Sequence, residues 1–167
     1  MKKIVVVGAT GRLGRVVVGG LSDYEVVRAG RSGPDLKIDA LDFESVSDVF
    51  ASIGTFDGLI SCIGGTPFKT FEELTMEDFA LGLSKKCFSQ LNLAKAAIPY
   101  LTENGSITLT SGIIGDEPIL AGSCAAAANG ALNTCVSTLA AEYAGKLRIN
   151  IVSPPIIENS VEDYGML

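Results

Sequence analysis

Three glycines near the amino terminus have the spacing that a phosphate-binding turn requires. Gly8, Gly11 and Gly14 directly follow the apolar run at residues 4–7, where a strand would end and a helix begin. The first glycine permits the sharp turn, the second lets the backbone approach a pyrophosphate, and the third lets the helix pack closely on the strand. Backbone N–H groups at the helix start would then face the anion. We therefore predict a dinucleotide site here; the alternative is a tight strand-to-helix turn without a ligand.

The charge that follows the second predicted strand indicates which nicotinamide dinucleotide would bind. NAD offers a ribose diol to a carboxylate, whereas NADP offers a phosphate dianion to a cation. The strand ends in Ala29, Gly30, Arg31 and Ser32, with no acid among them, and Arg12 in the glycine turn is a second cation within reach of the same phosphate. A planar guanidinium suits bidentate phosphate binding. The sequence thus favours NADP over NAD, unless both arginines are ordinary surface residues.

The glycine turn is the first step in an alternation of strand and helix patterns along the whole chain. Strand-like runs cover 3–7, 25–29, 36–38, 57–62, 106–110 and 147–152. Helical periodicity covers 12–21, 44–53, 75–101 and 122–144. This alternation predicts a Rossmann-type α/β fold, a doubly wound parallel sheet of about six strands in a three-layer αβα arrangement. The loops 64–70 and 112–121 would lie over the carboxyl edge of the sheet, where such folds bind ligands.

The composition is that of one globular domain. We expect a dinucleotide-binding domain over 1–153, followed by a polar tail over 154–167. A net charge of −6 argues against binding to nucleic acid or to an anionic membrane. The four cysteines form no C-x-x-C pair and the first residues lack the apolar segment of a signal peptide, so we expect a cytoplasmic protein with reduced thiols. Histidine is absent from the sequence and the carboxylates are scattered, so we predict no metal site.

The order of these pieces resembles that of the short-chain dehydrogenase/reductase family over essentially the whole chain. The glycine turn is followed by Asp39 after the third strand, and by the segments 58–64, 105–111 and 148–154 at the fourth, fifth and sixth strands. The resemblance implies that Asp39 caps the edge of the adenine ring and that residues 62–64 run past the adenosine ribose. The predicted cofactor-binding residues are therefore Gly8, Thr10, Gly11, Arg12, Leu13, Gly14, Arg31, Ser32, Asp39, Cys62, Ile63 and Gly64.

By the same resemblance, the catalytic residues of typical members are substituted in this chain. Typical members reduce a carbonyl with a tyrosine acid, a lysine, a serine and an asparagine, and the corresponding positions are Ala125, Asn129, Gly112 and Lys86. Ala125 has no titratable atom, so we expect little or no reduction of ordinary aldehydes, ketones or quinones. If activity occurs, Lys86 is the candidate proton donor or carbonyl polariser, and Ser111 the candidate for orienting the substrate. The alternative for Lys86 is a place on a solvated helix face.

These observations leave three functions open. The first is an NADP-dependent short-chain oxidoreductase that acts on an unknown small carbonyl compound or enone. The second is a non-catalytic NADP-binding sensor or regulator, and the third is a structural subunit. If the chain is complete, the strand at 147–152 forms a sheet edge that a partner subunit would cover. The family resemblance implies a homodimer or homotetramer through the third and fourth helices.

Overall fold

A parallel sheet of six strands forms the centre of the protein. The strands are β1 (Lys3–Val7), β2 (Glu25–Gly30), β3 (Leu36–Lys37), β4 (Phe56–Ser61), β5 (Leu101–Thr110) and β6 (Arg148–Val152). Their order in the sheet is β3-β2-β1-β4-β5-β6, so the chain changes direction between β1 and β4 and a crevice opens at that switch point. The computed structural model describes residues 1–155, and the remainder of the predicted polar tail lies outside the described residues.

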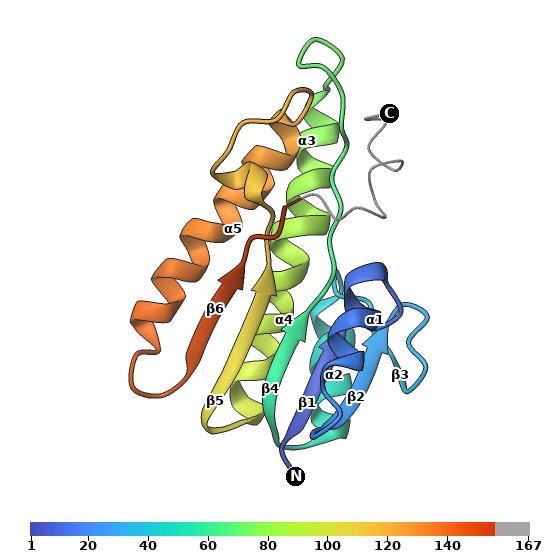
Figure 1. Ribbon diagram of the computed structural model, residues 1–167, viewed down its shortest axis with the longest axis vertical. Coiled ribbons are helices and arrows are strands. Elements are labelled where there is room, and N and C mark those ends of the chain that lie inside the picture. Colours follow the sequence, from blue (N-terminus) through green and yellow to red (C-terminus); the bar gives the residue numbers. More distant parts are fainter. Residues whose placement is uncertain (156–167) are drawn as a thin grey trace.

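Helices cover both faces of this sheet (Figure 1). They are α1 (Arg12–Gly19), α2 (Phe43–Ile53), α3 (Met76–Gly82), α4 (Ser89–Ala97) and α5 (Ser123–Glu142). On one face α1 packs against a small apolar cluster around Ile4 and Val6, and on the other face α2, α4 and α5 surround a larger cluster that includes Phe50, Leu93 and Leu132. Within residues 1–155, none of the helices is long and apolar enough to cross a membrane.

The structure confirms the α/β fold, the parallel sheet, the bounds of β1 and a long third helical segment, which is helical without a break over 76–100 but is not α-helical throughout. The pattern over 75–101 predicts one α-helix, whereas the chain forms α3, a π-helical segment η1 (Leu83–Phe88), α4 and a 3-10 turn η2 (Ile98–Tyr100). A π-helix closes its hydrogen bonds one residue further along the chain than an α-helix, and an apolar pattern does not distinguish the two. The strand β5 is also longer than predicted, because it extends back to Leu101 through a register shift against β4.

The loops that follow β4 and β5 are tied together over the carboxyl edge of the sheet. The backbone N–H of Lys69 donates to the carbonyl oxygen of Ala121 at 3.1 Å. The ammonium of Lys69 also forms an ion pair with Asp78 at 2.8 Å. Asp78 belongs in turn to the capping box that Thr75 makes at the start of α3. One residue thus fixes the β4 loop to both the β5 loop and the helix that begins beside it.

Candidate active site

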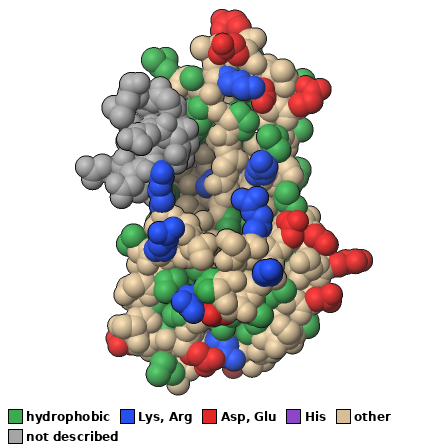
Figure 2. Space-filling model, turned by 90° about the vertical axis from the view of Figure 1, so that its right-hand side faces the viewer, with side chains coloured by type: hydrophobic (Ala, Val, Ile, Leu, Met, Phe, Trp, Pro, Cys, Tyr) green, Lys and Arg blue, Asp and Glu red, His purple; other side chains and the backbone are tan. Residues whose placement is uncertain are grey.

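Two adjoining cavities open at this carboxyl edge. The large cavity, of about 640 Å³, lies among the glycine turn and the ends of β2 and β4. The small cavity, of about 180 Å³, lies among the ends of β4 and β5, η1 and α5. Five residues line both cavities: Cys62, Ile63, Gly64, Gly65 and Thr66. Figure 2 shows a hollow in one face of the molecule with Lys and Arg side chains on both sides of it, although the net charge of the chain is −6. This local positive charge favours an anionic ligand.

The glycine turn has the geometry that its spacing predicts. Gly8 has a φ of 84°, and its N–H donates to the carbonyl oxygen of Ala29 at 2.9 Å, which turns the chain at the end of β1. Gly14 is buried in α1, where an added Cβ would collide with the carbonyl oxygen of Gly8. Gly11 is the N-cap of α1 and makes no side-chain cap. An anionic ligand can therefore take the place of a cap at this end of the helix.

Most residues predicted to bind the cofactor surround the large cavity. Those that line it are Gly8, Thr10, Gly11, Arg31, Ser32, Asp39, Cys62, Ile63 and Gly64. Leu13 lines the small cavity instead. Gly14 lines neither, because it is buried beneath the turn and serves its packing. Arg12 lies at the exposed start of α1 and also lines neither cavity.

The sequence did not identify several residues that contribute to the site. Lys85 and Ser89 line the large cavity, next to the segment that places Lys86 in the small one. Asn129, which the family resemblance assigns to a substituted catalytic position, lines the small cavity. Consecutive residues of an α-helix point about 100° apart, so a sequence pattern offers no reason to expect two adjacent lysines in two adjacent cavities. The only available signal was the position of both lysines in the third predicted helix.

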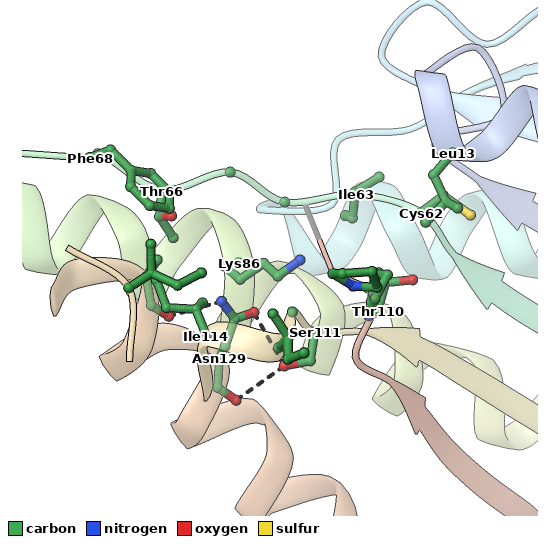
Figure 3. A pocket seen from close by; sticks show the side chains of 18 residues that line it. Leu13, Cys62, Ile63, Thr66, Phe68, Lys86, Thr110, Ser111, Ile114 and Asn129 are labelled. Atoms are coloured by element: carbon green, nitrogen blue, oxygen red, sulfur yellow. Dashed lines mark hydrogen bonds between the residues drawn. The ribbon is translucent and has the colours of Figure 1, made fainter. Parts of the chain in front are cut away.

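Lys86 is a buried cation, and no described residue is its counter-ion. Its side chain is 9% exposed and extends across the small cavity toward Thr110 and Ser111 (Figure 3). Within residues 1–155, its ammonium group makes no hydrogen bond or ion pair, and the side chain passes so close to Gly64 that a Cβ there would collide with Lys86 Cδ. Burial lowers the pKa of Lys86 to about 8, and burial raises the pKa of the neighbouring Cys62 thiol to about 11. At neutral pH the pair is therefore an ammonium and a neutral thiol.

Ser111 and Asn129 form the neutral polar side of the small cavity. Both are buried, and the hydroxyl of Ser111 donates to Asn129 Oδ1 at 3.2 Å (Figure 3). Asn129 Nδ2 donates in turn to the carbonyl oxygen of Ala125 at 2.9 Å. The hydroxyl hydrogen of Ser111 is thus already used within the protein, and Lys86 is the strongest donor that still faces the cavity. The two predicted catalytic residues, Lys86 and Ser111, line the same cavity.

Replacing Lys86 by methionine is expected to stabilise the protein at pH 7. The pKa of Lys86 falls from 10.5 in the unfolded chain to about 8 on folding, so holding the charged form in the folded state costs up to about 3 kcal/mol. Between those two pH values the unfolded chain binds more protons, so the stability of the wild type rises with pH across this window. The advantage of Lys86→Met should therefore shrink between pH 7 and pH 10. Urea unfolding at both pH values measures this difference.

The exposed neighbour Lys85 supplies the control for that measurement. Lys85→Met removes the same type of charge from the adjacent position and should change the free energy of unfolding by less than about 0.5 kcal/mol. A Lys86→Met protein that is less stable than the wild type at pH 7 would show that the ammonium is not held in a desolvated place.

Comparison with known sequences finds one matching family model and several curated relatives. A sequence model of the family described as enoyl-(acyl carrier protein) reductase matches residues 25–164. A tropinone reductase homolog of Arabidopsis thaliana is 34% identical over 117 residues, which cover 68% of this chain and 43% of that protein. The matched region spans less than half the length of the first curated relatives.

Solved structures agree with the sequence matches. A crystal structure of a protein from Listeria innocua has 37% sequence identity and a TM-score of 0.93, over 100% of this chain and 84% of that one. A small-chain dehydrogenase crystallised in complex with NADPH has 29% identity and a TM-score of 0.83, over 92% of this chain and 69% of that one. The family match over most of the chain and the agreement of the whole fold confirm the resemblance noted in the sequence: the chain belongs to the short-chain dehydrogenase/reductase family.

Proposed function

We propose that the protein is an NADP(H)-dependent oxidoreductase that acts slowly on a small carbonyl compound, with Lys86 in place of the usual tyrosine acid. One observation carries the proposal: the ammonium of Lys86, which has no ion pair within residues 1–155, lies in a small cavity that shares a wall with a dinucleotide-sized one. A cavity of about 180 Å³ suits a compact substrate, since an engineered apolar cavity of about 150 Å³ holds benzene. The small cavity also has an apolar side, formed in part by Ile63, Ile114 and Ile119.

The large cavity fits a dinucleotide in volume and in chemistry. The uncapped start of α1 suits a pyrophosphate, and Arg31 and Ser32 at the end of β2 suit the additional phosphate of NADP. Arg31 is exposed and has no hydrogen bond or ion pair within residues 1–155, whereas Arg28 is held by Asp35 at 2.7 Å. Asp35, four residues after Arg31 in the sequence, is thus already paired with another cation. An NADPH complex is known for one structural relative, which supports the same assignment.

Arg31→Ala is expected to weaken NADPH binding at least tenfold, about 1.4 kcal/mol, and to leave NADH binding unchanged. The guanidinium contacts the phosphate that distinguishes the two cofactors, so its loss removes the preference for NADPH. Calorimetric titration of both cofactors measures this result. Arg148→Ala is the control, because Arg148 is an exposed arginine of β6 that lines neither cavity. Equal affinities of the wild type for NADPH and NADH would contradict the assignment.

The residues of the small cavity can complete a reduction by supplying one proton. When bound in the large cavity, NADPH supplies a hydride to the carbonyl carbon of a substrate. Lys86 Nζ would donate a hydrogen bond to the substrate oxygen, polarise the carbonyl and transfer its proton to that oxygen as negative charge develops. The resulting neutral amine regains a proton from water. With a pKa of about 8, Lys86 is mostly protonated at pH 7 and can act as the acid.

A second candidate function is NADP binding without turnover. The observation that favours it is Ala125, which lines the small cavity with a methyl group at the position that the family resemblance assigns to the tyrosine acid. The two candidates differ in one experiment. Both predict cofactor binding by calorimetry, but only the reductase oxidises NADPH when a panel of small aldehydes, ketones, enones and quinones is added. Absence of any NADPH binding would contradict both.

A further inference from the structure

The π-helical segment η1 contains the catalytic candidate Lys86, and two of its backbone carbonyls accept hydrogen bonds from side chains. The N–H of Ser89 donates to the carbonyl oxygen of Ser84, five residues earlier, as a π-helix requires. Two side chains from the following turn then satisfy carbonyls within the segment. Ser89 Oγ donates to the carbonyl oxygen of Lys85 at 2.8 Å, and Gln90 Nε2 donates to the carbonyl oxygen of Lys86 at 2.9 Å.

Gln90 makes a second connection, to the end of β5. Its Nε2 also donates to the carbonyl oxygen of Thr110 at 2.8 Å, and its Oε1 accepts from the backbone N–H of Thr110 at 2.9 Å. The Gln90 side chain is fully buried, so these bonds form away from water, where losing a partner costs the most. Thr110 directly precedes Ser111 in the sequence. One amide therefore joins the backbone at Lys86 to the backbone that carries Ser111.

We infer that Gln90 is a positioning residue, whose amide fixes the π-helical turn to the end of β5 and so keeps the ammonium of Lys86 inside the small cavity. The geometry supplies the reason. A relaxation from π-helix to α-helix shifts the register by one residue, which turns the side chains on one side of the segment by about 100°. Lys86 would then leave the cavity, because within residues 1–155 its ammonium has no hydrogen bond or ion pair that would keep it there. The inference rests on the proposed function only for the chemical use of Lys86, because its position can be measured without turnover.

A purely structural role for Gln90 predicts a different result. In that case the amide only satisfies three buried backbone groups, and its loss would lower the stability of the protein without moving Lys86. The ionisation of Lys86 separates the two roles, since a lysine in the cavity titrates far below its ordinary range. Among residues 1–155, the titratable group that interacts with Lys86 is Cys62, just after β4.

The test is a pH titration of the lysine side chains by NMR, with ¹³C at the ε-carbons and the Lys86 signal assigned by its absence from Lys86→Met. In the wild type, Lys86 should titrate near pH 8. In Gln90→Met and in Gln90→Asn, it should titrate at least one pH unit higher, because the ammonium reaches water. Gln90→Asn keeps an amide in the buried site but is one methylene too short to bridge both backbones, so it supplies the result if Gln90→Met does not fold.

Asn92→Ala is the matched control. Asn92 is also an amide of α4 that binds backbone carbonyls, those of Ala40 and Leu41, but it has no connection to Lys86 or to β5. The titration of Lys86 should be unchanged in this variant. A Lys86 pKa that stays within about 0.3 of the wild-type value in folded Gln90→Asn would overturn the inference, as would an equal rise in Asn92→Ala. Failure of the wild type to bind NADPH would contradict the proposed function and leave this result standing.

Discussion

Gly11→Val is expected to weaken NADPH binding at least 100-fold while the fold persists. Gly11 is exposed at the start of α1 with an extended backbone, φ −70° and ψ 172°, which any residue adopts. An added Cβ would have the carbonyl oxygen of Gly8, at 3.2 Å, as its nearest neighbour, so the protein can accommodate it with a small adjustment. A pyrophosphate bound at the helix start has no such freedom, because it needs the backbone N–H groups at hydrogen-bond distance.

Calorimetry measures the loss of binding, and circular dichroism measures the fold. Gly19→Ala, in the same helix, is the control: an added Cβ there meets nothing within 4 Å, and NADPH affinity should be unchanged. Gly14→Ala should behave in a third way and destabilise the protein itself, since its Cβ collides with the turn. A folded Gly11→Val protein with wild-type affinity would move the cofactor site away from the glycine turn.

Lys86→Met is expected to reduce the rate of NADPH oxidation about 100-fold or more. We expect the wild type to turn over below about 1 s⁻¹, because the family's tyrosine position is Ala125 and a positioned acid contributes about 10²- to 10⁴-fold. Lys86 must be protonated to act as the acid, so the wild-type rate should be retained below pH 8 and lost as the pH rises through its pKa of about 8. Methionine preserves the length of the side chain and removes the proton.

The control for this loss is Lys95→Met. Lys95 lies outside both cavities, with its ammonium 5.4 Å from the centre of the Phe43 ring, and its replacement should leave the rate and its pH profile unchanged. The profile of any residual activity in Lys86→Met should be flat around pH 8. Turnover that survives both Lys86→Met and Ser111→Ala would refute the assignment of the small cavity as the reacting site.

The fold was predictable where local sequence and long-range packing agree. The run before Gly8 is apolar at every position because β1 is covered by helices on both faces, and its bounds were predicted as they occur. The π-helical segment was not predictable in this way. Gln90, an ordinary helix residue in the sequence, acquires its partner Thr110 on β5 only in the packed protein.

Most residues that line the site could be predicted from the sequence, but the contacts between them could not. The spacing of the glycines and the absence of an acid near Arg31 pointed to one edge of the sheet, and the structure brings most of those residues around one cavity. The contact of Ser111 with Asn129 joins a residue just after β5 to a residue of α5, 18 positions apart, and no local pattern encodes it. Likewise, the burial of Lys86 depends on Gly64 from another loop, so sequence alone left its environment undecided.

The wall of five residues shared by the two cavities makes their occupants thermodynamically dependent on each other. A ligand of the small cavity that orders the segment from Cys62 to Thr66 reduces the conformational entropy that NADPH loses on binding. NADPH has the same effect on the ligand. By linkage, each must change the affinity of the other by the same factor. A non-reacting substrate analogue can therefore be recognised before any reaction is known, by the shift that it causes in the dissociation constant of NADPH.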